Sequence, residues 1–147
     1  FFLSIHTQYD YKRKEAKNAG ALEAFSPEQI KQINEYCLGN IVGVIDFVGA
    51  EKTTNFAVNI IKKGGTVIVV GLFGGSLSLP IPLISMRSLN LKGSCVGELN
   101  ELKELIDIIK NGSVKLINVN TQKLSTANEA LSDLRNGKVN GRIVLQP

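Results

Sequence analysis

Short, nearly continuous apolar runs alternate along this sequence with helix-like stretches of about ten residues. Buried strands of a parallel sheet need such runs, because helices cover both faces of the sheet and neither face meets water. The expected strands are residues 1–6, 21–25, 41–48, 66–70, 89–96, 114–123 and 142–145. The fold class predicted from this alternation is α/β.

Helices are expected between these strands, at residues 11–19, 26–38, 53–63, 98–110 and 125–135, with an irregular segment and a short helix over residues 77–88. The start at Ser26 resembles a capping box, in which Ser26 accepts from the Gln29 amide and the Gln29 side chain answers back. Pro27 suits the first helical position.

Two helices are expected to be amphipathic. Over residues 53–63 the shared apolar face is predicted to be Phe56, Ile60 and Ile61. Over residues 98–110 it is Leu99, Leu102, Leu105, Ile106 and Ile109. Glu98, Glu101 and Glu104 lie opposite these leucines, which favours a solvated face over a paired-carboxylate site.

Composition excludes several classes of protein. A chain of 147 residues with 44% hydrophobic content suits one globular domain, with room for a fragment of a second. The net charge is +4, but Lys and Arg are scattered among Asp and Glu, so no nucleic-acid stripe is indicated. No apolar run approaches the roughly 20 residues of a membrane span. A soluble, cytoplasmic protein is expected.

His and Cys give no sign of a metal site or a nucleophile. Cys37 and Cys95 have no CxxC or Cys/His companion, which indicates neither a zinc ribbon nor a disulfide. Cys95 lacks a neighbouring base, so ordinary packing is the expected role. His6 ends a strand without a catalytic motif nearby, and a structural role is expected for it.

Glycines follow three of the expected strands, at Gly49, at Gly71 with Gly74 and Gly75, and at Gly93 with Gly97. A glycine in this position lets a flat ligand approach the backbone at the carboxyl edge of a parallel sheet. Each glycine alone is ordinary turn chemistry, but three in succession indicate a ligand crevice.

Four segments together resemble one family. They are residues 16–21 (AKNAGA), 44–49 (VIDFVG), 64–71 (GGTVIVVG) and 137–145 (GKVNGRIVL). In order and spacing they are similar to the medium-chain, zinc-containing alcohol dehydrogenases over essentially the whole chain. The family's zinc-free quinone reductases share much of this pattern and stay as an alternative, as does a noncatalytic remnant. The resemblance implies a Rossmann-like domain over residues 1–113 and, over 114–147, a segment returning to the catalytic domain.

The resemblance also implies a nicotinamide coenzyme, NAD or NADP, across the carboxyl edge of the sheet. Val70 would offer its carbonyl to the carboxamide, Ser94 and Val96 would offer backbone amides, and Arg142 would reach the pyrophosphate. The implied coenzyme contacts are Thr7, Lys12, Phe47, Val48, Gly49, Val70, Gly71, Leu72, Ser94, Val96 and Arg142. Thr7 stands where NAD enzymes of the family place an acid, and Lys12 matches a lysine near the same ribose, so NAD and NADP both stay open.

Two parts of the family pattern have no counterpart in this sequence. The G-x-G-x-x-G phosphate loop and the zinc ligands match nothing here, and the resemblance places them before the strand at residues 1–6. The strand that accompanies the phosphate loop would fill the middle of the sheet, so a central gap is expected. By itself the segment is expected to turn over no alcohol, because it has no Lewis acid.

The resemblance implies a substrate and an assembly as well. Leu72 and Cys95 would flank the reacting carbon, which favours a small hydrophobic alcohol or aldehyde. The strand at residues 89–93 would be the outermost one and would pair with a second copy, giving a homodimer or tetramer. No membrane or nucleic-acid partner is expected.

Overall fold

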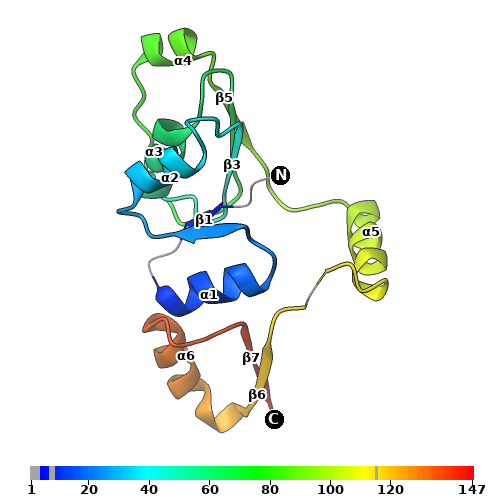
Figure 1. The fold of residues 1–147 in the computed structure, drawn as a ribbon. Coiled ribbons are helices and arrows are strands. Elements are labelled where there is room, and N and C mark those ends of the chain that lie inside the picture. Colours follow the sequence, from blue (N-terminus) through cyan, green and yellow to red (C-terminus); the bar gives the residue numbers. More distant parts are fainter. Residues whose placement is uncertain (1–3, 7–8, 115) are drawn as a thin grey trace.

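A computed structural model describes residues 4–6, 9–114 and 116–147 (Figure 1). Strands and helices alternate along the chain, which confirms the α/β class. The strands are β1 (Ser4–His6), β2 (Glu23–Phe25), β3 (Gly43–Asp46), β4 (Thr66–Val69), β5 (Asn90–Gly93), β6 (Val119–Lys123) and β7 (Arg142–Gln146). The helices are α1 (Asp10–Asn18), α2 (Ile30–Tyr36), α3 (Glu51–Ile60), α4 (Ile81–Arg87), α5 (Leu99–Lys110) and α6 (Ala127–Arg135), the last preceded by a 3₁₀ turn, η1 (Leu124–Thr126).

The strands form three small sheets, and every pairing is parallel. β3, β4 and β5 make a three-stranded sheet in that order, while β1 pairs with β2 and β6 pairs with β7. In the larger sheet Val44 lies opposite Val67, which lies opposite Leu91. The β1–β2 pair is separate from β3, as expected for a sheet that lacks a strand at its middle.

The main core lies where α3 packs on the three-stranded sheet. Its buried residues are Ala57, Val58, Ile61 and Val67, and partly buried side chains from neighbouring strands and loops surround them. Of the three residues predicted to share the apolar face of this helix, Ile61 is buried, whereas Phe56 and Ile60 are only half-buried. Its buried positions are 54, 57, 58 and 61, a true i, i+3, i+4, i+7 stripe.

The end of α3 is secured by an arginine from α4. Arg87 donates from Nη1 to the carbonyl of Val58 at 2.8 Å, and its other terminal nitrogen donates to the carbonyl of Ile61. These carbonyls lie in the last turn of α3, where no further helical amide can reach them. One side chain therefore closes the helix and ties α4 to the core.

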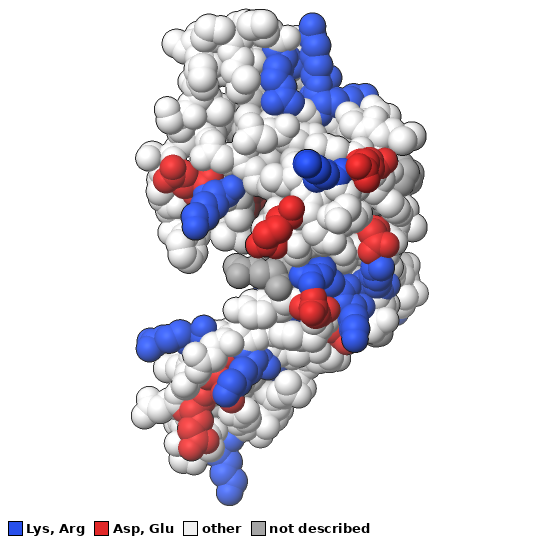
Figure 2. All heavy atoms as spheres, turned by 60° about the vertical axis from the view of Figure 1, so that its left-hand side comes forward, with Lys and Arg blue, Asp and Glu red and all other residues white. Residues whose placement is uncertain are grey.

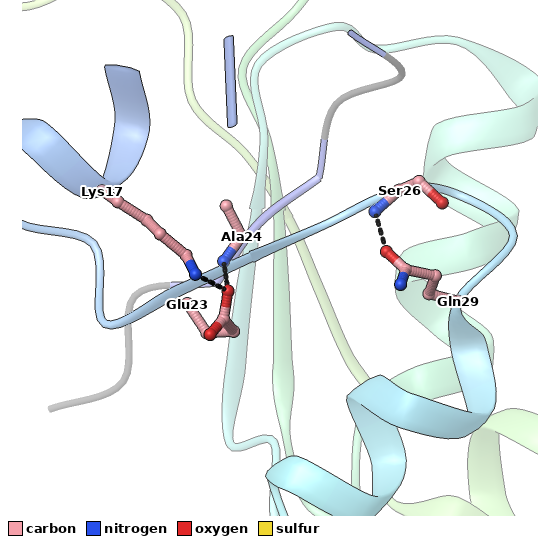
Figure 3. Close-up of polar contacts among 5 residues, drawn as sticks. All are labelled: Lys17, Glu23, Ala24, Ser26 and Gln29. Carbon is pink, nitrogen blue, oxygen red and sulfur yellow. Dashed lines mark hydrogen bonds and ion pairs between the residues drawn. The ribbon is translucent and has the colours of Figure 1, made fainter. Parts of the chain in front are cut away.

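Two sets of local polar contacts lie before and after β2 (Figure 3). Glu23 forms an ion pair with Lys17 and accepts a hydrogen bond from the Ala24 amide at 2.9 Å. Both contacts lower the pKa of the Glu23 carboxyl, and the hydrogen bond from Lys17 has the larger effect. The Gln29 side chain accepts from the Ser26 amide at 2.7 Å, so half of the expected capping box is present.

The start of α2 differs from the prediction. The Gln29 amide donates to the Ser26 carbonyl at 3.1 Å rather than to the Ser26 hydroxyl. The chain therefore makes a turn at Pro27, and the helix begins at Ile30.

α5 stands apart from the three sheets (Figure 1). Its first turn is held by the Glu101 carboxylate, which accepts from the Glu98 amide at 2.7 Å. The apolar stripe is present as predicted, yet no residue of the helix is buried, and Leu102 is 53% exposed. Within the described residues this apolar face is not covered.

Charges are mixed over the surface. Figure 2 shows acidic and basic side chains interspersed on the face in view, in keeping with the absence of a basic stripe in the sequence. Among the described residues, no helix is both long and apolar enough to cross a bilayer.

Candidate functional site

Parallel strands β3, β4 and β5 end at one edge of their sheet, and the loops after β3 and β4 are hydrogen-bonded to each other there. This edge displays large apolar side chains: Phe47 is 74% exposed, Leu72 is 86% exposed and Val96 is 91% exposed. Such exposed apolar groups on successive loops mark a surface that a ligand can cover. The structure thus brings together the predicted residues that follow β3 and β4, and those after β5 leave the sheet at the same edge.

The loops after β3 and β4 are joined into one body by their backbones. The amides of Val70 and Gly71 both donate to the Asp46 carbonyl, at 2.9 and 3.0 Å. Later in the same loops, the Phe73 amide donates to the Val48 carbonyl and the Gly74 amide donates to the Gly49 carbonyl, each at 3.1 Å. The two loops therefore cannot move independently.

Two of the predicted glycines are required by this pairing. A Cβ on Gly49 would overlap the carbonyl of Gly71, and a Cβ on Gly71 would overlap the backbone of Val48. Gly49 also has a φ of +67°, which favours glycine. Both glycines are therefore needed where the two loops touch, and their expected role of admitting a flat ligand stays a prediction.

Asp46 is the site residue that sequence reasoning missed. Only 6% of it is exposed, and its carboxylate accepts four hydrogen bonds. One oxygen takes the amides of Val48 and Gly49, both at 3.0 Å. The other takes the hydroxyls of Thr53 and Thr54, both at 2.8 Å. The carboxylate thus joins the end of β3, the following loop and the first turn of α3.

This environment keeps Asp46 ionised. Burial alone would raise the pKa of the carboxyl, but the hydrogen bonds from Gly49, Thr53, Thr54 and Val48 outweigh it and hold the pKa below its ordinary value. A lowered pKa means that the ionised carboxylate stabilises the folded chain. This stabilisation is complete at a pH above the pKa of the unfolded chain, and it is lost as the pH falls through the lower pKa of the folded chain.

The loop after β5 differs in part from expectation. The Ser94 amide donates to the Val69 carbonyl at 3.0 Å, so it continues the β4–β5 pairing and is not available to a coenzyme as expected. Val96 has a φ of +49°, a left-handed conformation rare for a β-branched residue. Cys95 is exposed rather than packed.

The expected contacts outside these loops lie on other elements. Lys12, on α1, places its Nζ 5.2 Å from the ring centre of Tyr9 and 5.9 Å from that of Tyr11. Arg142 is exposed at the start of β7, and its amide donates to Asn118 at 2.8 Å. Thr7 and the side chain of His6 lie outside the described residues.

The segment before Arg142 is held against α1. The Tyr11 hydroxyl donates to the Gly137 carbonyl, and the Tyr9 ring packs against Gly137 itself. Gly137 precedes Arg142 by five residues in the same α6–β7 connection. The two expected basic contacts, Lys12 and Arg142, therefore belong to segments that touch each other.

With this geometry in place, comparison with known proteins decides the family. A model of the family described as zinc-binding dehydrogenase matches residues 7–111. The chain belongs to this family, the medium-chain zinc-containing alcohol dehydrogenases. The resemblance of the four sequence segments is thereby confirmed.

Relatives and solved structures of the family agree. The chain is similar to an NAD-dependent alcohol dehydrogenase of Sulfurisphaera tokodaii, 35% identical over 90% of this chain and 39% of the relative. An alcohol dehydrogenase of Geobacillus stearothermophilus is 34% identical over 93% of this chain and 41% of the relative. The crystal structure of the Aeropyrum pernix alcohol dehydrogenase superposes with a TM-score of 0.88 at 31% identity, covering 98% of this chain and 42% of that one.

The chain spans about two fifths of the length of the relatives it matches. Zinc belongs to the family, but residues 4–6, 9–114 and 116–147 contain no group of three His, Cys, Asp or Glu side chains that could hold a metal ion. The residues that the structure describes therefore do not fit a metal site.

Proposed function

We propose that this chain is the coenzyme-binding part of an NAD(P)-dependent alcohol dehydrogenase, which transfers a hydride between an alcohol and a nicotinamide coenzyme. The observation that carries the proposal is the edge where the β3 and β4 loops are locked together with Phe47 and Leu72 outward. A rigid backbone edge with exposed apolar groups suits a flat ring with a polar carboxamide.

In this proposal the chain's residues bind and orient the coenzyme. The Val70 carbonyl and the Val96 amide address the carboxamide, while Phe47, Val48 and Gly49 lie along the coenzyme with Gly71 and Leu72. The bound coenzyme supplies the hydride acceptor. Lys12 and Thr7 belong to the adenosine ribose end, where NAD and NADP differ.

Leu72 and Cys95 are proposed to flank the alcohol. Both are exposed in the structure and neither side chain carries charge, so they leave a charged substrate without a partner. A small or medium hydrophobic alcohol or aldehyde is therefore the proposed substrate class.

The test is an activity survey of the enzyme that contains this chain. Alcohol-dependent reduction of NAD or NADP, with hydrophobic alcohols ahead of polyols and charged hydroxy acids, is the expected result. Quinone-dependent oxidation of NADPH without alcohol turnover would favour the zinc-free quinone oxidoreductases instead. Absence of any coenzyme binding would favour a noncatalytic remnant.

Arg142→Ala is expected to weaken coenzyme binding in that enzyme by about 1–3 kcal/mol, the range for losing a charge-assisted hydrogen bond. Arg142 is exposed at the start of β7, where a guanidinium can reach two phosphate oxygens. The dissociation constant, measured by fluorescence titration of the reduced coenzyme, reports the loss.

Arg135→Ala is the matched control, since Arg135 ends α6 in the same β6–β7 unit. It should leave the dissociation constant unchanged. Equal constants for the wild type and Arg142→Ala would mean that Arg142 is an ordinary surface arginine.

The proposed assembly is a homodimer, or a dimer of dimers, built on β5. This strand is an edge of its sheet, and Leu91 is 45% exposed on it. The Asn90 amide donates to the carbonyl of Gly65, just before β4, and the Ser94 amide donates to the carbonyl of Val69 in β4. Because amides alternate along a strand, those of Leu91 and Gly93 face the free edge, where a second copy can pair.

Leu91→Pro is expected to abolish dimer formation while leaving the β4–β5 pairing intact, because proline removes only an outward donor. Sedimentation velocity measures the assembly. Asn90→Pro is the contrasting variant, since it removes the donor to Gly65 and should destabilise the sheet itself. A wild-type monomer, or a Leu91→Pro variant that still dimerises, would place the interface elsewhere.

The proposal also includes the division of the chain and its compartment. Residues 1–113 form the partial dinucleotide-binding domain, and residues 114–147 return to the catalytic domain. Cys37 and Cys95 are both free thiols, which suits the reducing cytoplasm.

A further inference from the structure

The carboxylate of Asp46 lies behind the loop that the proposed function assigns to the coenzyme. Its two oxygens have separate partners: Oδ1 accepts the amides of Val48 and Gly49, and Oδ2 accepts the hydroxyls of Thr53 and Thr54. Asp46 and Thr54 are each only 6% exposed, so the bond between them is buried, and the other three are partly buried. Hydrogen bonds to a buried charge are among the stronger ones in proteins.

The same residue also holds the second loop. Its backbone carbonyl accepts the amides of Val70 and Gly71, at 2.9 and 3.0 Å. Asp46 thus fixes the loop after β3 with its side chain and the loop after β4 with its main chain. Because the Thr53 and Thr54 hydroxyls belong to the first turn of α3, one residue connects both loops and the start of this helix.

The loops are anchored on their inner side only. Phe47 is 74% exposed and Val48 is 48% exposed, so their outer side is open to a ligand. A ligand bound there meets a backbone whose geometry has been set beforehand from the interior. Such preorganisation lowers the cost of binding, because the loop need not be ordered at that moment.

We infer that Asp46 is a positioning residue for the coenzyme: it fixes the backbone of residues 47–49 and 70–71 in the conformation that binds it, without touching the coenzyme itself. This inference rests on the proposed function. Asp46 is expected to affect how tightly the coenzyme binds, and to affect the rate of hydride transfer much less.

Asparagine replaces this carboxylate only in part. If the amide oxygen of Asp46→Asn faces Val48 and Gly49, its NH₂ group faces the two threonine hydroxyls, which now donate. If the amide is turned, the NH₂ group faces two backbone amides. In the first orientation both hydroxyls must turn to accept from the NH₂ group, and Thr53 can then donate to the Ala50 carbonyl at 3.0 Å. The negative charge that strengthens all four hydrogen bonds is lost in either orientation.

The experiment measures coenzyme dissociation constants, kcat, KM and thermal unfolding midpoints in the enzyme that contains this chain. Asp46→Asn should raise the dissociation constant and the coenzyme KM about tenfold, within the range for small misplacements at a site. At saturating coenzyme, kcat should change much less. Thr54→Val, which removes one buried hydroxyl, should raise the constant by about threefold.

Two further variants separate positioning from plain stability. Thr54→Ser keeps the hydroxyl and should restore wild-type affinity. Val58→Ala, on the same helix and 1% exposed, removes core packing without touching Asp46. It should lower the unfolding midpoint at least as much as Thr54→Val, with an unchanged dissociation constant.

The outcomes are distinct. An unchanged coenzyme constant in Asp46→Asn overturns the inference and leaves the proposed function standing. The inference is also overturned if the coenzyme dissociation constant of Val58→Ala rises as its unfolding midpoint falls. Weaker binding in Asp46→Asn would then reflect lost stability alone. A wild-type enzyme that binds neither NADH nor NADPH overturns the proposed function and the inference with it.

Discussion

Gly49→Ala is expected to destabilise the fold by about 3 kcal/mol, as a positive φ and an overpacked contact act together. The added Cβ would overlap the carbonyl of Gly71, and Gly71 is held in place by its bond to the Asp46 carbonyl. Neither loop can retreat without breaking the pairs that join them. Denaturant unfolding of the chain measures the loss of stability.

Gly39→Ala is the matched control for backbone conformation. Gly39 has a φ of +64°, close to the +67° of Gly49, but a Cβ there meets nothing within 4 Å. Its cost should be about 1 kcal/mol, from the left-handed backbone alone. Equal losses for the two variants would contradict the close loop contact.

Ile61→Ala is expected to cost about 3 kcal/mol, the middle of the range for a large-to-small change in a core. Ile61 is 1% exposed and belongs to the cluster with Ala57, Val58 and Val67. The described core is small, so the cavity left by the missing atoms removes a large share of it. The unfolding free energy of the chain is again the measurement.

Ile81→Ala serves as the control, because the same atoms are removed where the side chain is 77% exposed. Its cost should be below about 1 kcal/mol. If both isoleucine variants lose the same stability, the core is not centred on α3 and β4.

The sequence predicted which segments are strands better than where they end. β4 is observed at Thr66–Val69 within the predicted 66–70, since a β-branched run between glycines is a local signal. The predicted strand at 41–48 shortens to Gly43–Asp46, because Asp46 turns the chain by capturing the amides after it. That capture depends on tertiary geometry.

The helix faces show why only Ile61 of the predicted α3 face is fully buried. Hydrophobic size favoured Phe56 and Ile60, whereas the buried stripe contains Ala57 and Thr54. The Thr54 hydroxyl is satisfied in this buried position by the Asp46 carboxylate. A periodicity that counts apolar residues does not register a polar residue whose partner lies eight positions earlier.

The candidate site was predictable in position but not in mechanism. Glycines after β3 and β4 pointed to the edge where these two loops touch, yet the contact that requires them, of Gly49 with Gly71, involves residues from both loops. The uncovered face of α5 was equally beyond prediction. The spacing of Leu102 and Leu105 shows that the helix is amphipathic and says nothing of what covers it.

A crystal structure of the enzyme that contains this chain, with NADH or NADPH bound, tests the central claim most directly. We expect the nicotinamide at the carboxyl edge of β3, β4 and β5, with its carboxamide within hydrogen-bonding distance of the Val70 carbonyl and the Asp46 contacts unchanged. A coenzyme bound away from the loops at residues 47–49 and 70–72 would contradict this claim.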